Sequence, residues 1–166
     1  CVEVAYLDIE QMKSTFTELA TLLLGDAKQA KSFMTKAKLH SMEELEDSWW
    51  NLYEKLLSTG RVVELSLKIE LEDFLYYVQK LIHNKNLSTD ENLTGDVSID
   101  TSAFDDSQCI GDWCAHFNST WKNHKLVGMD IGTDSLVLMV LSNEEFKRAQ
   151  ELAKELLHRI DVAERL

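Results

Sequence analysis

The hydrophobic pattern changes its period once in the first half of the chain, and this change constrains the fold more than any other feature. Up to Gly60, apolar residues recur every three or four positions, which is the period of helices that bury one face. We expect three helices within residues 8–58. From Arg61 to Ile69 apolar and polar residues alternate, which predicts a half-buried strand, and a helix follows over about 70–83.

Residues 84–106 lack this regularity and are rich in Asn, Ser, Thr, Asp and Gly. We expect a long loop here, with a short extended piece at 97–99. Loops of this length inside a compact domain are usually functional or disordered. A helix resumes near Ser107, and its apolar face runs to Trp121.

Two apolar runs near the C-terminus predict a β-hairpin. They are Leu126–Ile131 and Ser135–Leu141, joined by a turn at 132–134. The second run is apolar on both faces, so we expect it at the centre of the sheet. Ser142 and Glu145 have the spacing of a capping box, which starts a final helix whose buried face runs to Ile160.

These elements together predict an α+β fold in a single domain spanning residues 1–166. A helical part covers about 8–58. A sheet-containing part covers about 61–163 and has three or four strands with helices packed on them.

The chain is acidic, with 17 Lys and Arg against 29 Asp and Glu and a formal net charge of −12. This balance argues against direct binding to nucleic acid or to an anionic membrane surface, which both need basic patches. No apolar run approaches the roughly 18 residues of a membrane span. Three cysteines do not form a disulfide framework and favour a cytoplasmic protein; the alternative is a lipoprotein that carries its lipid on Cys1.

Residues 86–121 contain no Lys or Arg, and they hold more than half of the net charge. Their seven acids are Asp90, Glu91, Asp96, Asp100, Asp105, Asp106 and Asp112. One interpretation is a solvated loop. The other is a docking surface for a basic partner, because clustered carboxylates steer association. A second acidic cluster over 43–47 adjoins Trp49, which belongs to the buried stripe of its helix, and Trp50, which lies off that stripe. Trp50 is a candidate exposed anchor, and the alternative is a partly buried packing residue.

The sequence contains no recognisable catalytic or cofactor motif, so we expect no enzyme activity, no cofactor and no metal. Cys109 and Cys114 are five residues apart and diverge around a helix, which does not fit zinc and favours buried thiols. Asp130 and Asp134 flank a turn and fit turn chemistry better than acid–base catalysis, because no histidine adjoins them in sequence.

From Ser48-Trp49-Trp50 onward, over about residues 45–160, the order of features resembles an uncharacterised bacterial domain family, a domain of unknown function. The resemblance rests on the segment 62–81, on the Trp113/Phe117/Trp121 helix and on the run from Met129 to Leu138 before a capped final helix. It implies an α+β fold and brings no established activity.

The overall profile is similar to bacterial toxin-immunity proteins of contact-dependent inhibition systems, which is an analogy of type. We therefore expect an immunity protein that binds a cognate toxin, a basic ribonuclease, and covers its active site with the acids of residues 86–112. The alternatives are a general interaction or scaffold module and a small hydrolytic enzyme acting through Asp130 and Asp134. The sequence leaves open which toxin is bound and whether the protein is a monomer or a dimer.

Overall fold

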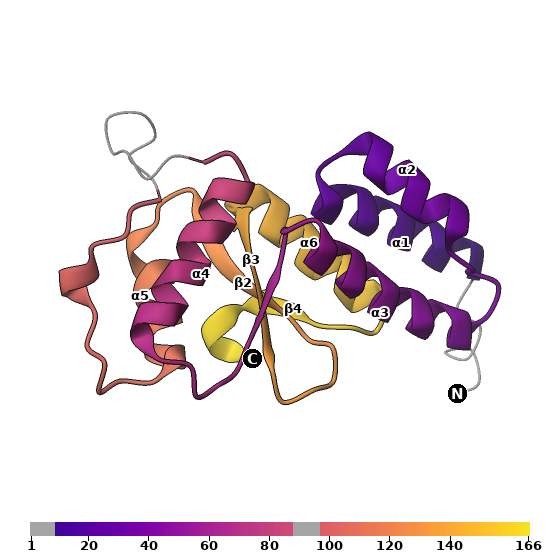
Figure 1. The fold of residues 1–166 in the computed structure, drawn as a ribbon. Coiled ribbons are helices and arrows are strands. Elements are labelled where there is room, and N and C mark those ends of the chain that lie inside the picture. Colours follow the sequence, from indigo (N-terminus) through magenta and orange to yellow (C-terminus); the bar gives the residue numbers. More distant parts are fainter. Residues whose placement is uncertain (1–8, 88–96) are drawn as a thin grey trace.

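The structure is a computed structural model that describes residues 9–87 and 97–166. In these residues the chain forms six α-helices and a four-stranded antiparallel sheet, with the N-terminal helices first (Figure 1). The elements are α1 (Ile9–Leu24), α2 (Ala27–Lys36), α3 (Met42–Ser58), β1 (Val63–Leu65), α4 (Leu71–Asn84), α5 (Ile110–Thr120), β2 (His124–Met129), β3 (Leu136–Ser142), α6 (Asn143–Glu155) and β4 (Ile160–Val162). The expected α+β fold is confirmed.

The sheet has the strand order β1-β3-β2-β4. The hairpin expected from the two apolar runs is present: β2 and β3 pair from His124 opposite Ser142 to Met129 opposite Val137. On the other side, β3 pairs with β1. The prediction that the run over 135–141 would form a central strand is therefore confirmed.

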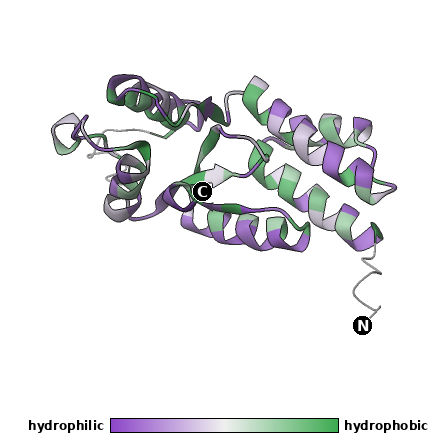
Figure 2. Ribbon diagram, turned by 90° about the horizontal axis from the view of Figure 1, so that it is seen from below, coloured by the Kyte–Doolittle hydropathy of each residue, from purple (hydrophilic) through white to green (hydrophobic). Residues whose placement is uncertain are grey.

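Helices cover both faces of the sheet, which explains why β3 is apolar throughout. Successive β3 residues point to opposite faces. Val137, Met139 and Leu141 join a core with residues of α1, α3 and α6. Leu136, Leu138 and Val140 join a second core with residues of α4 and α5. Figure 2 shows the helices with hydrophobic and hydrophilic sides, as expected for helices that each bury one face.

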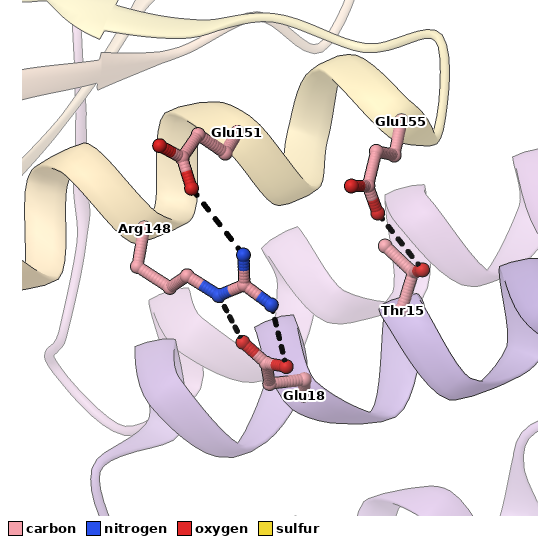
Figure 3. A network of polar contacts seen from close by, with 5 residues as sticks. All are labelled: Thr15, Glu18, Arg148, Glu151 and Glu155. Carbon is pink, nitrogen blue, oxygen red and sulfur yellow. Dashed lines mark hydrogen bonds and ion pairs between the residues drawn. The ribbon is translucent and has the colours of Figure 1, made fainter.

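A polar contact across the outside of α1 and α6 accompanies their apolar packing (Figure 3). The Arg148 guanidinium donates from Nε and Nη2 to the two carboxylate oxygens of Glu18, and Thr15 Oγ1 donates to Glu155 at 3.1 Å. The hydrogen bond from Arg148 lowers the pKa of Glu18. Both partners of this ion pair are about half exposed, so it contributes little to stability.

The expected strand over 61–69 is shorter in the structure, because β1 covers Val63–Leu65 alone. Leu65 pairs with Leu136, the first residue of β3, so the chain beyond Leu65 has no strand to pair with. It turns instead, and Ile69 N donates to Ser66 O. Leu67 is consequently 57% exposed, although the alternating pattern predicts that it is buried.

The expected final helix also ends early. α6 stops at Glu155, and Ile160 belongs to a fourth strand, β4, that pairs with β2. Two residues beyond the helix, Leu157 has a left-handed φ of 63°, and His158 N donates back to Ala153 O. This hydrogen-bond pattern usually has glycine at the left-handed residue. No glycine or proline marks the end in this sequence, so the periodicity alone extends the helix too far.

The expected capping box at Ser142 and Glu145 is confirmed, with Ser142 Oγ accepting from Glu145 N and Glu145 Oε1 accepting from Ser142 N. Among the described residues, no helix is long and apolar enough to cross a membrane.

Candidate partner-binding surface

The structure describes five of the eight predicted partner-binding residues, while Asp90, Glu91 and Asp96 lie outside the described residues. Asp100, Asp105, Asp106 and Asp112 are all exposed, as is Trp50. The four aspartates lie between α4 and the first turn of α5, on one side of the sheet, and Trp50 belongs to α3 on the other side (Figure 1).

Asp100 and Asp105 each accept hydrogen bonds that order the chain locally. Asp100 Oδ1 accepts from the backbone N and the Oγ of Ser102, at 3.1 and 2.6 Å. Asp105 Oδ1 accepts in the same way from Ser107, at 2.9 and 2.7 Å. These hydrogen bonds lower the pKa of both carboxyl groups, so both are negatively charged at neutral pH. Each carboxylate is thus held in place by its own turn, using one oxygen.

Asp112 and Cys109 cap the N-terminus of α5. Asp112 Oδ2 accepts from Cys109 N at 3.3 Å and from Cys109 Sγ at 3.2 Å. The expectation that both helical cysteines would be buried is wrong for Cys109, which is exposed because it precedes the helix, and right for Cys114. Burial raises the pKa of the Cys114 thiol to about 12.

A first hollow lies where the chain enters α4 and α5. Asp106 and Cys109 line one side, and Leu67, Glu70 and Glu72 line the other. Asp106 is the one predicted acidic residue that faces this hollow among those described. Local sequence patterns do not predict that residues 67–72 lie opposite Asp106, because the hollow joins segments almost 40 positions apart.

A second hollow lies beside Trp50, which is 42% exposed and leans on the buried ring of Tyr53 at a centroid distance of 5.0 Å. Trp49 is buried, as its place on the apolar stripe predicts, and Trp50 is exposed, which agrees with the exposed alternative for this residue. The rest of the lining comes from Glu46, the β2–β3 turn and residues 157–159, after α6.

His158 is the main residue of this second hollow that the sequence did not indicate. Its ring stacks on Trp49 at a centroid distance of 4.1 Å and an angle of 2°, and its Nε2 lies 3.2 Å from Glu46 Oε1. Burial lowers the pKa of His158, against the opposing effect of the carboxylates of Glu46 and Asp130. In sequence no histidine adjoins Asp130, but β4 brings His158 close to it in space.

Asp130 takes the turn role that the sequence favours. Its Oδ1 accepts from Gly132 N at 2.8 Å, and Gly132 has a left-handed φ of 77°. Its backbone carbonyl accepts from Trp49 Nε1 at 2.9 Å, which fixes the turn to α3. Within residues 9–87 and 97–166, no group of three His, Cys, Asp or Glu side chains is placed to hold a metal ion.

A third hollow connects the other two. It shares Asp130 and Arg159 with the hollow beside Trp50, and it shares Leu67 with the hollow beside Asp106. The three therefore form one continuous strip, which we call the acidic edge. It runs from α3, past the β2–β3 turn, to the start of α4 and α5, at the lower end of the sheet in Figure 1.

The acidic edge combines exposed apolar residues with negative charge. Of the seven large apolar side chains exposed in the described part of the chain, four line it: Trp50, Leu67, Leu157 and Leu166. Lys68 and Arg159 are the lysine and arginine that line the acidic edge. Six carboxylates outnumber them: Glu46, Glu70, Glu72, Asp106, Asp130 and Asp134. Exposed apolar residues gathered within a polar rim are typical of protein interfaces.

Comparison with known proteins gives one match. The profile of a family described as a domain of unknown function (DUF6630) matches residues 9–163. The match extends further toward the N-terminus than the resemblance over 45–160, so the first two helices belong to the shared domain. No curated protein and no solved structure matches the chain.

Proposed function

We propose that this chain, which belongs to the DUF6630 family of domains of unknown function, works by binding a basic partner protein through its acidic edge. The observation that carries the proposal is the gathering of exposed apolar side chains among six carboxylates on one continuous strip. The proposed action is binding, and it assigns no catalytic residue and no cofactor.

The two kinds of side chain have different parts in such an interface. Aromatic and aliphatic anchors such as Trp50 and Leu157 supply most of the affinity once they enter pockets of a partner. Carboxylates at the rim raise the association rate for a basic partner and disfavour acidic ones. A stable complex needs roughly 800 Å² buried on each partner, so the whole strip is engaged rather than one hollow.

For the identity of the partner, we propose a cognate toxin domain, a basic ribonuclease, whose active site the carboxylates of the acidic edge would cover in place of the RNA phosphates. The support is the net charge of −12 and the analogy with acidic immunity proteins. On this proposal the protein acts in the cytoplasm, where the toxin's substrate is.

Co-expression tests the pairing. The protein, carrying an affinity tag, is produced together with the product of the neighbouring open reading frame, and both are purified through the tag. We expect a stoichiometric complex and loss of that product's ribonuclease activity. A complex without loss of activity would support the scaffold alternative, and no complex would contradict the proposed pairing.

Charge reversal tests the surface. Glu70 and Asp106 line the edge, and neither side chain forms a capping hydrogen bond, so Glu70→Lys with Asp106→Lys changes charge with little effect on the fold. Four charge units at about 10 Å from one partner charge amount to roughly 1.7 kcal/mol in water, or about a 15-fold slower association at low salt. At about 0.1 M salt screening leaves only a few-fold effect.

The control reverses Glu144 and Glu151, two exposed carboxylates of α6 outside the edge; Glu151 also loses an exposed ion pair with Arg148, which contributes little to stability. Its association rate, measured by stopped flow, should fall much less. Equal slowing by the two double variants would mean that net charge matters and the acidic edge does not.

A further inference from the structure

The hollow beside Trp50, at the α3 end of the acidic edge, has a supported aromatic face. The Trp50 ring leans on Tyr53, and the Tyr53 hydroxyl is hydrogen-bonded to Glu64 next to β3. Trp50 is therefore held in position although 42% of it is exposed. A ring fixed in this way can meet a ligand without a further loss of side-chain freedom.

Two carboxylates give the same hollow its charge. Glu46 is exposed and contacts His158, and Asp130 is exposed in the β2–β3 turn. Because burial lowers the pKa of His158, its imidazole is neutral at neutral pH and leaves the charge of Glu46 uncompensated. Among the described residues that line the hollow, Arg159 is the one cation, and its Nη2 already donates to Asp161 and to the carbonyl of Arg165.

Leu157 gives this hollow an exposed apolar side. It is 65% exposed, and its left-handed φ of 63° belongs to the residue that terminates α6. An exposed leucine in the same hollow as Trp50 offers apolar surface that a partner can cover.

We propose that this hollow binds an arginine side chain of a partner protein, with the guanidinium between the Trp50 ring and the carboxylate of Glu46 and its aliphatic stem against Leu157. The inference rests on the proposed function, because it names the chemistry by which the basic partner is recognised. Arginine fits better than lysine, since its planar guanidinium stacks on an aromatic face and still donates to a carboxylate.

The test is a titration of the whole protein, labelled with ¹⁵N, followed by NMR at pH 7. The probes are three dipeptides: acetyl-Arg-Leu-amide, acetyl-Lys-Leu-amide and acetyl-citrulline-Leu-amide, in which citrulline has the shape of arginine without its charge. We expect the arginine peptide to shift the indole N–H signal of Trp50 with saturation, and to bind at least fivefold more tightly than the citrulline peptide. The lysine peptide should lie between them.

Two variants locate the effect. Glu46→Gln should weaken binding of the arginine peptide at least threefold, whereas Glu144→Gln makes the same charge change on α6, outside the acidic edge, and should leave binding unchanged. Equal binding of the arginine and citrulline peptides, or equal effects of the two variants, would overturn the inference.

The probes contain no partner protein, so this result is separate from the test of the proposed function. If the partner binds through the acidic edge but the arginine peptide does not bind beside Trp50, the inference fails and the proposed function stands. If the arginine peptide binds here and no basic partner is found, the hollow is an arginine site and the proposed function fails.

Discussion

Gly128 is the penultimate residue of β2, between Leu138 of β3 and Asp161 of β4, and it is buried. An added Cβ would overlap Leu166 Cδ1 and lie 3.1 Å from Leu166 Cγ. Gly128→Ala should therefore displace the Leu166 side chain, because that side chain is the mobile part of the contact and the strand is not.

The expected magnitude follows from the burial of Leu166, which is 38% exposed. Full burial of a leucine is worth about 1.5–3 kcal/mol, so displacing this one costs about 1–2 kcal/mol. Alanine in a strand is favoured over glycine by roughly 0.5–1 kcal/mol. Subtracting the gain from the cost leaves a net loss of up to about 1.5 kcal/mol in the free energy of unfolding for Gly128→Ala, with a midpoint of about 0.7 kcal/mol.

Without the Leu166 side chain, Gly128→Ala should raise the free energy of unfolding instead of lowering it. In a Leu166→Ala background nothing is displaced, so Gly128→Ala should stabilise the protein by roughly 0.5–1 kcal/mol. Urea unfolding of the four proteins, followed by circular dichroism at pH 7, measures this double-mutant cycle. If Gly128→Ala has the same effect in both backgrounds, to within about 0.3 kcal/mol, the proposed contact with Leu166 does not govern this position.

Three further predictions concern charged groups and thiols. Burial disfavours ionisation of Glu145, but the hydrogen bonds from Lys85 and from Ser142 outweigh this effect and lower the pKa of Glu145. Lys85→Met should therefore cost about 1–2 kcal/mol in the free energy of unfolding, measured with urea at pH 7. This cost should shrink as the pH falls through the pKa of Glu145 in the folded state. Because burial lowers the pKa of His158, the unfolded chain binds the proton more tightly than the folded one, so stability should fall as the pH drops below about 6.5. His158→Gln should flatten this part of the curve of stability against pH. An unchanged slope would contradict the reasoning. In a Cys1→Ser background, maleimide should label Cys109 and leave Cys114 unmodified in the folded protein, and a bound partner should protect Cys109 if the acidic edge is the interface.

The elements predicted correctly are those whose burial follows from the hydrophobic pattern of their own residues. β3 is apolar at six successive positions because both of its faces are covered, and this alone places it at the centre of the sheet. The capping box of α6 could also be predicted from sequence, because Ser142 and Glu145 lie three positions apart.

The errors arise where a neighbour in space decides the structure. The alternation from Arg61 to Ile69 continues past the point where β3 can pair with it, so Leu67 is exposed. The end of α6 depends on Leu157 adopting a left-handed conformation that its side chain disfavours. Leucine at this position does not predict the end of a helix. The short β4 was missed for the same reason.

The candidate site shows the same division. Asp106 and Trp50 could be identified from charge and periodicity, but their placement at the two ends of one strip could not. That placement depends on Leu67 and Asp130, which join the three hollows. His158 was not identified as a site residue because its importance comes from stacking on Trp49, a contact over more than 100 positions.

The outer strands of the sheet, β1 and β4, are only three residues long. Many proteins recruit a partner by letting it extend a sheet, which requires a longer row of unpaired backbone N–H and C=O groups. Such short borders give an incoming strand little to bond to. They also protect the chain from joining its own copies edge to edge. On the proposed function, recognition would therefore depend on side chains rather than on strand pairing. Side chains can change between relatives without altering the backbone, so proteins sharing one architecture could be specific for different partners.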